Sequence, residues 1–152
     1  MLNEILKSKP DNVEYLEMNA ISLESMGALE KSKEAYESLL VKSNNNYHAY
    51  KLAGLQFRMN KGEDAYTTIK KADALPDQET INVTFQVNQN YNQNIALKAA
   101  ISYLEGIIAE SLGKSVEAKV CYERAVQLSP DFVLAKSKLE IIKAKEAEEK
   151  QN

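Results

Sequence analysis

The sequence contains few of the residues on which catalysis, metal binding or disulfide bonding depends. It has one cysteine, one histidine and no tryptophan in 152 residues. The single cysteine, Cys121, excludes an internal disulfide, and its place in a strongly helical stretch favours a small buried side chain over a reactive thiol. No apolar run approaches the roughly 20 residues that span a bilayer.

The one histidine, His48, has no sequence partner for metal ligation or nucleophilic catalysis. No second histidine or cysteine cluster could complete a zinc site, and the neighbouring Asn45 and Asn46 do not supply the acid of a Ser/His/Asp set. We expect His48 to begin a helix and to face solvent. Gly113-Lys114-Ser115 is similar to the end of a phosphate-binding loop, but Ile108 stands where that motif needs glycine. The sequence therefore predicts no enzyme, no cofactor and no metal.

The composition is that of a soluble globular protein, with 44% hydrophobic and 27% charged residues. A net charge of −3 does not favour a polyanionic partner such as nucleic acid. The first residues, Met1 to Glu4, show neither the basic start nor the apolar stretch of a secretory signal. We therefore expect the cytoplasm, with the periplasm as the alternative if a signal was removed together with an upstream region.

One pattern of small and large residues occurs three times. A small residue comes first, a glycine or asparagine follows where a helix must stop, and a second small residue precedes a large one by four positions. The three sets are Ala20, Gly27, Ser32, Tyr36 and Leu39; Ala53, Asn60, Ala65, Ile69, Ala72 and Pro76; and Gly106, Gly113, Ala118, Tyr122, Ala125 and Pro130. Repeats with a period of 33 or 34 residues predict a solenoid of helix pairs.

The spacing of the copies divides the chain. Ser32 to Ala65 is 33 residues, whereas Ala65 to Ala118 is 53, so about 19 residues are inserted between the second and third copies. Pro76 ends one helix, and Ser129-Pro130 fits a cap followed by proline at the first helical position. The predicted segments are the second helix of a truncated repeat at 1–9, repeats at 13–44, 46–79 and 99–130, an insert at 80–98, and a capping helix at 131–150.

These copies resemble the tetratricopeptide repeat, over about residues 1–79 and 99–150. The resemblance departs where Leu16 and Ser102 replace the early aromatic of helix A, and where Asn19 and Glu105 replace the leucine before the small residue. It implies an all-α, right-handed superhelical solenoid of antiparallel helix pairs. Such a solenoid usually binds other proteins and performs no chemistry.

The resemblance also implies a binding groove, because the concave face of this family is lined mainly by helix A of each repeat. Carried over by position, the candidate partner-binding residues are Glu17, Ile21, Tyr47, Tyr50, Phe57, Arg58, Tyr103 and Ile107, with Glu14, Glu24 and Glu110 beside them. An aromatic groove flanked by acids suits an extended or helical peptide with apolar anchors and some basic residues. A clamp for a C-terminal carboxylate is not expected, since Lys51 is the only basic residue at the positions such clamps use. The alternative is that several aromatics pack between repeats.

Residues 80–98 break the helical period. Ile81, Val83, Phe85 and Val87 alternate with polar residues, which predicts a strand, and 88–94 reads as a polar loop. Residues 95–97 either form a short second strand or begin the next helix. The insert is thus a β-hairpin that contacts a partner, or a surface loop whose apolar side packs on neighbouring helices.

The predicted function is a protein–protein interaction module or assembly scaffold, without nucleic acid and without a membrane span. Two alternatives remain open at this point. The chain could be a self-associating structural segment, since 81–87 could drive homodimerisation. It could also be a regulatory domain of a longer, enzyme-containing chain, because Met1 falls inside a repeat.

Overall fold

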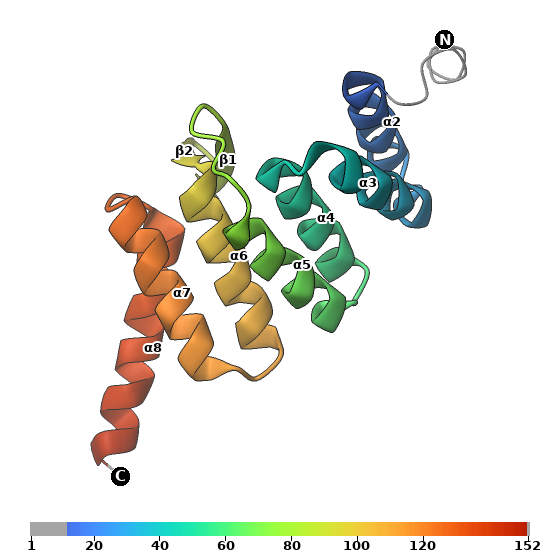
Figure 1. Ribbon diagram of the computed structural model, residues 1–152. Helices are drawn as coiled ribbons and strands as arrows, with labels where there is room; N and C mark the ends of the chain where they lie inside the picture. The colour runs from blue at the N-terminus through green and yellow to red at the C-terminus, as the bar shows by residue number, and fades with distance from the viewer. Residues whose placement is uncertain (1–11, 152) are drawn as a thin grey trace. The chain divides into compact units, whose positions relative to one another are not determined.

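A computed structural model describes residues 12–151 of the chain. The chain divides into two compact units, Met1–Pro76 and Asp77–Asn152, and each is described by itself. The helix predicted at 1–9 lies outside the described residues. The elements of the first unit are α2 (Val13–Ser25), α3 (Leu29–Ser43), α4 (Asn46–Arg58) and α5 (Gly62–Ala74) (Figure 1). Those of the second are β1 (Asn82–Asn88), β2 (Tyr91–Ala96), α6 (Leu97–Ser111), α7 (Ser115–Leu128) and α8 (Val133–Gln151).

The turns of the first unit are made by the residues that the repeat pattern singled out. Gly27, Asn44 and Asn60 have φ angles of +79°, 48° and 62°, a left-handed conformation that glycine and asparagine adopt most readily. Two asparagines cap the helices that follow a loop: the Asn12 side chain accepts the backbone N–H of Glu14, and Asn45 caps α4 in the same way. Because the turns are short, α2 and α3 form one antiparallel helix pair, and α4 and α5 form another.

Within each pair, a small residue on the first helix lies against a large one on the second. Ala20 and Tyr36 are both buried in the first pair, and Ala53 and Ile69 in the next. The Ser32 hydroxyl donates to the Ala20 carbonyl at 2.9 Å, which fixes the crossing. The small side chains let two backbones approach, and the large ones fill the space beside them.

The second unit has the same combination of a small and a large residue, and there the two helices approach closely. A Cβ added to Gly106 would lie 2.6 Å from Cε1 of Tyr122, so any other residue there would force the Tyr122 ring or a helix to shift. Gly113, at φ +76°, closes the turn between them. α8 packs on α7 through Ala135 and Leu139, which are the buried residues of an otherwise largely exposed helix.

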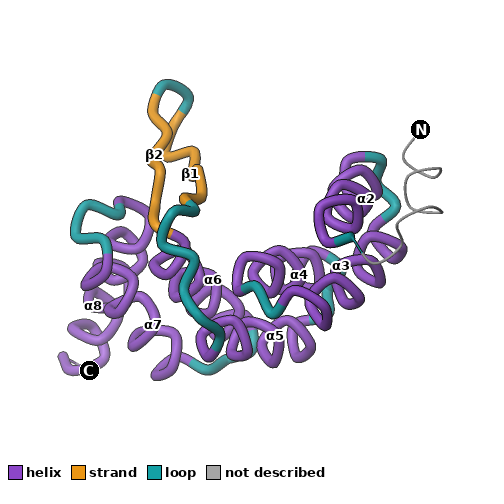
Figure 2. The backbone as a smooth tube through the Cα atoms, turned by 45° about the horizontal axis from the view of Figure 1, so that its top comes forward, coloured by secondary structure: helices purple, strands orange, loops and turns teal. Residues whose placement is uncertain are grey.

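The insert is a β-hairpin, one of the two forms that the sequence left open (Figure 2). β1 and β2 pair antiparallel, with Thr84 opposite Asn94 and a register irregularity after Gln86. The prediction of a polar loop over 88–94 is wrong: the turn is confined to 89–90 and β2 begins at Tyr91. The buried residue there is the polar Gln93, whose amide bonds to Asp131 and Val133, so this part of the strand shows no apolar alternation.

One helix boundary also differs from the prediction. α8 begins at Val133, so Pro130 lies in the turn before the helix and does not occupy its first helical position. The turn is closed by the Phe132 amide donating to the Ser129 carbonyl at 3.0 Å. The all-α fold of antiparallel helix pairs with a small β insert is confirmed. Among the described residues, no helix is long and apolar enough to cross a membrane.

Candidate peptide-binding face on α2 and α4

The exposed surface of α4 is a single stripe. Seven of its residues are buried, from Asn46 to Gln56, and those that reach solvent recur at intervals of three or four, which places them on one side of the helix. They are Tyr47, Tyr50, Lys51, Gly54, Phe57 and Arg58. The four α4 residues that the sequence analysis selected, Tyr47, Tyr50, Phe57 and Arg58, therefore share one face.

The α2 residues reach this face through ion pairs. Glu24 contacts Arg58 at 2.9 Å and Lys51 at 3.4 Å. Glu17 contacts His48 at the start of α4. Ile21 stays 42% exposed between the two carboxylates. Together α2 and α4 form one surface, which we call the α2–α4 face: Glu17, Ile21, Glu24, Tyr47, Tyr50, Lys51, Gly54, Phe57 and Arg58.

Gly54 leaves an opening in the middle of this face. Apart from its chain neighbours and the backbone of its own helix, no atom lies within 4 Å of where its Cβ would stand. Glycine inside a helix costs about 0.5–1 kcal/mol relative to alanine. Tyr50 lies one turn before it and Phe57 nearly one turn after it on the same stripe. The opening is therefore bracketed by two half-exposed aromatic rings.

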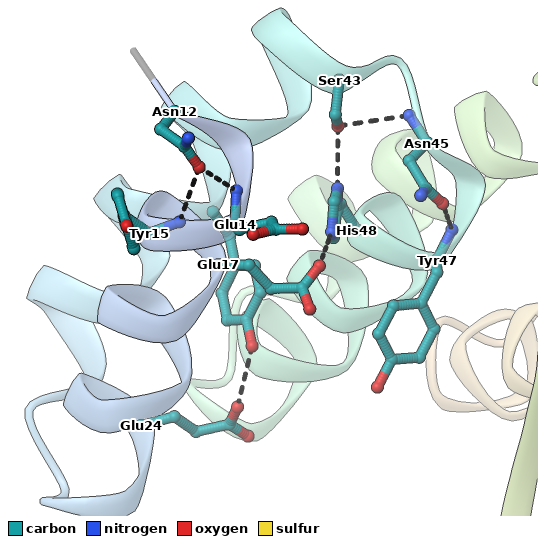
Figure 3. Close-up of polar contacts among 10 residues, drawn as sticks. Asn12, Glu14, Tyr15, Glu17, Glu24, Ser43, Asn45, Tyr47 and His48 are labelled. Carbon is teal, nitrogen blue, oxygen red and sulfur yellow. Dashed lines mark hydrogen bonds and ion pairs between the residues drawn. The ribbon is translucent and has the colours of Figure 1, made fainter. Parts of the chain in front are cut away.

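The sequence analysis expected His48 to face solvent, but this prediction is wrong, because the residue is 1% exposed. Its Nε2 donates to the Glu17 carboxylate, and its Nδ1 lies 2.7 Å from the Ser43 hydroxyl, which also accepts the Asn45 amide (Figure 3). Because a carboxylate only accepts, Nε2 carries the proton of the Glu17 contact, and Nδ1 and the Ser43 hydroxyl share the second hydrogen bond. The error arose because a histidine in the first turn of a helix reads as exposed unless a partner on a distant helix is known.

The residue types Ser43, His48 and Glu17 are those of a hydrolase triad, but their arrangement is not. The imidazole ring is 1% exposed, whereas a catalytic histidine must lie within reach of the proton that it transfers. Each of the three residues comes from a different helix, α2, α3 or α4. The bonds therefore tie consecutive helices together and hold Glu17 at the edge of the face.

Glu24 has a second partner beneath the face. The Tyr36 hydroxyl donates to its Oε1 at 3.4 Å. Burial raises the pKa of this phenol well above its usual range, and the charge of Glu24 adds to the shift. Glu24 is thus held by a tyrosine of its own helix pair and by two cations of the next.

The other two predicted residues lie in the second unit, on α6. Ile107 is half-buried, and Tyr103 is packed among aromatic rings. The Tyr103 centroid is 5.6 Å from Phe85, 5.0 Å from Phe132 and 5.8 Å from Tyr122. Burial raises the pKa of the Tyr103 phenol, with a smaller effect from Glu110. Tyr103 thus packs among aromatic rings that include Phe85 of the insert and Phe132 before α8, in line with the alternative that aromatics pack between repeats.

Two further polar features lie in the second unit. Cys121 is buried as predicted, and its thiol donates to the carboxylate of the 2% exposed Glu105 at 2.6 Å. A hollow of about 640 Å³ lies between α7 and α8, and the Lys119–Glu146 pair, 2.9 Å apart, lines it. In residues 12–151 no group of three or more His, Cys, Asp or Glu side chains could hold a metal ion.

Sequence reasoning missed the opening at Gly54 and the pairing of Glu24. Gly54 directly follows the small residue Ala53 of the repeat pattern and is not itself part of that pattern, and only its place on the exposed stripe gives it a role. The acids of α2 were expected to flank the groove, but their partners Lys51 and Arg58 stand 27 and 34 positions away from Glu24. A search for opposite charges one repeat apart in the sequence could have found the Glu24–Arg58 pair.

No protein-family model and no curated protein matches the sequence. Solved structures do match. The crystal structure of MamA shares 20% identity and a TM-score of 0.74, covering 96% of this chain and 75% of that one. The first TPR of Spaghetti (RPAP3), bound to the HSP90 peptide SRMEEVD, shares 21% identity and a TM-score of 0.68, over 89% and 93%.

A third similar structure is the Yersinia enterocolitica type III secretion chaperone SycD, in complex with a peptide of the translocator YopD. It shares 15% identity and a TM-score of 0.68 over 88% of this chain and 93% of that one. The chain therefore has the tetratricopeptide-repeat fold, as its repeated small and large residues predicted.

Proposed function

We propose that the chain is a protein-interaction module whose α2–α4 face binds a peptide segment of a partner protein. The observation that carries the proposal is the open position at Gly54, bracketed by Tyr50 and Phe57 on the one exposed stripe of α4. An open position flanked by aromatic side chains is the kind of place where an interface concentrates its binding energy. Similar structures hold peptides, as the RPAP3 and SycD complexes do.

The paired charges refine the kind of peptide. Glu17 and Glu24 are already bonded to His48, Lys51 and Arg58, so a basic peptide residue would have to displace a partner inside the chain. An apolar side chain seated over Gly54 displaces nothing and removes aromatic surface from water. The peptide we expect is therefore anchored by an apolar residue, with its polar groups meeting the rim. The face supplies binding and performs no reaction.

Selection of peptides from a random library on the immobilised 152-residue chain tests this proposal. The selected peptides should share a large apolar residue, and Tyr50→Ala and Phe57→Ala should each weaken their binding about tenfold or more, as loss of a central anchor does. Gly54→Leu should weaken binding comparably because its side chain occupies the open position. Affinities can be measured by fluorescence anisotropy, with helicity monitored by circular dichroism.

Two variants separate an effect at the face from a general one. Gly54→Ala should stabilise the chain by about 0.5–1 kcal/mol, because it lowers the entropic cost of the helix and its methyl meets no atom. Val41→Ala removes an exposed apolar side chain of α3, away from the stripe, and should leave affinity unchanged. Binding that survives Tyr50→Ala, Phe57→Ala and Gly54→Leu in folded protein would contradict the proposal.

A further inference from the structure

The hairpin lacks the charges and prolines that often protect the edge of a sheet. Natural edge strands commonly carry charges, above all lysine, or proline, which discourage pairing with another chain. Residues 81–97 contain no charged residue, no proline and no glycine, in a chain of which 27% is charged. Among the described residues the sheet has two strands, so each strand has one unpaired edge.

The hairpin is nevertheless held in a fixed conformation. Phe85 of β1 packs against Tyr103 and Phe132, with ring centroids 5.6 and 5.1 Å apart. The Gln93 amide of β2 donates to the Asp131 carbonyl at 2.5 Å and accepts the Val133 amide at 2.9 Å. Isolated hairpins are marginal in water, and these contacts supply what a free hairpin lacks. The unpaired edge is thus preorganised.

The register determines which backbone groups point outward. The Leu97 amide donates to the Ile81 carbonyl at 3.0 Å, so these opposed residues form a hydrogen-bonded pair. Bonded and non-bonded pairs alternate along an antiparallel ladder, so Thr84–Asn94 is a non-bonded pair. The outward backbone groups of β1 therefore belong to Asn82, Thr84 and Gln86. Their side chains are exposed as well, and Thr84 Oγ1 donates to Asn94 Oδ1 at 2.7 Å.

We propose that the free edge of β1 pairs antiparallel with β1 of a second copy of this chain, about a two-fold axis at Thr84. In that register Thr84 faces its own equivalent and Asn82 faces Gln86, and all three pairs place outward N–H and C=O groups opposite each other. In both views β2 lies on the side of the α7–α8 connection and β1 on the other (Figures 1 and 2). The β1 edge is therefore the accessible one within this unit.

The side chains favour a second copy over an unrelated strand. Hydroxyl and amide groups both donate and accept, so Thr, Asn and Gln pair with copies of themselves, as Thr84 and Asn94 already do. A two-fold contact brings identical residues together, and charges there would repel. The complete absence of charge over 81–97 removes that penalty, whereas recognition of a different strand would leave charge complementarity unused.

Sedimentation of the 152-residue chain from about 10 µM to about 1 mM tests the proposal. Two short edges bury far less than a standard interface, so we expect a weak dimer within this concentration range. In parallel, the backbone amides of Asn82, Thr84 and Gln86 should exchange more slowly as concentration rises. Those of Val83 and Phe85, which are bonded inside the hairpin, should be protected at every concentration.

Thr84→Lys places like charges face to face at the axis and should weaken dimerisation at least tenfold. Thr84→Pro removes an outward amide that the hairpin itself does not use, and should have the same effect. Asn94→Lys is the matched control: it breaks the same Thr84–Asn94 bond and adds the same charge, but on β2, so the dimer should persist. Protected Val83 and Phe85 amides report an intact hairpin in each variant.

A chain that stays monomeric up to about 1 mM would overturn the proposal. So would a dimer that survives Thr84→Lys and Thr84→Pro, or one that Asn94→Lys disrupts equally. The proposal does not depend on peptide binding: Tyr50→Ala and Phe57→Ala should leave dimerisation unchanged, and Thr84→Lys should leave peptide affinity unchanged.

Discussion

The two units of the molecule fill one repeat position in opposite ways. Glu17 in α2 and Tyr103 in α6 both stand three residues before the small residue of helix A, which is Ala20 or Gly106. In the first unit Glu17 reaches the next helix through a hydrogen bond to buried His48. In the second unit Tyr103 meets Phe132, just before the next helix, with ring centroids 5.0 Å apart.

The helix crossing next to these two residues is built in the same way in both units. Tyr36 and Tyr122 each lie buried in the second helix of their pair. Each hydroxyl donates, at 3.4 Å, to a carboxylate four residues after the small residue, Glu24 or Glu110. The small residue and the tyrosine thus define the repeat, while the position above them is free to be polar or aromatic. Where the position is polar, as at Glu17, α4 keeps an exposed face. Where it is aromatic, as at Tyr103, the ring packs against Phe85 of the hairpin.

The largest expected difference concerns the aromatic cluster. Phe132→Ala removes a fully buried ring that contacts Phe85 and Tyr103, and should destabilise the chain by about 3–5 kcal/mol. Urea denaturation followed by circular dichroism measures this loss. Faster amide exchange in β1 should accompany it, because Phe85 loses a packing partner. Leu134→Ala, which truncates a half-buried side chain of α8, should have a smaller effect and leave the hairpin protected.

The next effect distinguishes the two helix A glycines. Gly106→Ala drives a methyl group to 2.6 Å from the Tyr122 ring and should cost about 1–3 kcal/mol. Gly54→Ala meets no atom and should stabilise the chain, as predicted above. Equal free energies of unfolding for the two alanine variants would show that the close crossing of α6 and α7 can relax.

High pH should weaken both units by the same mechanism. Burial raises the pKa of Tyr36 and Tyr122 well above the usual value of 10.0, and Glu24 and Glu110 add to the shifts. The folded chain therefore keeps phenolic protons that the unfolded chain releases above about pH 10. Stability is complete below that pH and falls as the pH rises, by about 1.4 kcal/mol per pH unit for each tyrosine. Tyr36→Phe and Tyr122→Phe should each flatten this dependence in urea titrations at pH 9–11.5, and an unchanged slope would argue against the burial.

The smallest expected effect concerns the hydrogen bond between Glu17 and His48. Glu17→Gln keeps the shape of the side chain but removes the negative charge of the group that accepts the hydrogen bond from His48 Nε2. It should lower the free energy of unfolding by about 0.5–1.5 kcal/mol. A double-mutant cycle with His48→Gln isolates the pairwise contribution. Purely additive effects would mean that the Glu17–His48 contact contributes nothing beyond packing. Arg58→Ala, which breaks the more exposed Glu24 pair, should cost less than 1 kcal/mol.

Most of the fold could be read from the sequence, and less of the candidate site could. Gly27, Asn60 and Gly113 predicted the turns, because a left-handed φ is a local demand that few residues meet. Tyr47, Tyr50, Phe57 and Arg58 were expected on one face because the repeat resemblance assigns that face to helix A, and their role in binding stays a prediction. The burial of His48 and the length of β2 were missed, since each depends on partners far along the chain, Glu17 in one case and Asp131 in the other.

The sequence by itself determined the repeat: its period, its stops, its small-to-large crossings and the position of the insert. These follow from backbone geometry and side-chain size within a single helix pair, which are local properties. Only the tertiary structure decided that Glu17 is bonded to a buried histidine, that Tyr103 is covered by Phe85, and that Gly54 opens onto solvent. Burial and pairing depend on which distant residues meet, and no local pattern in this sequence encodes that.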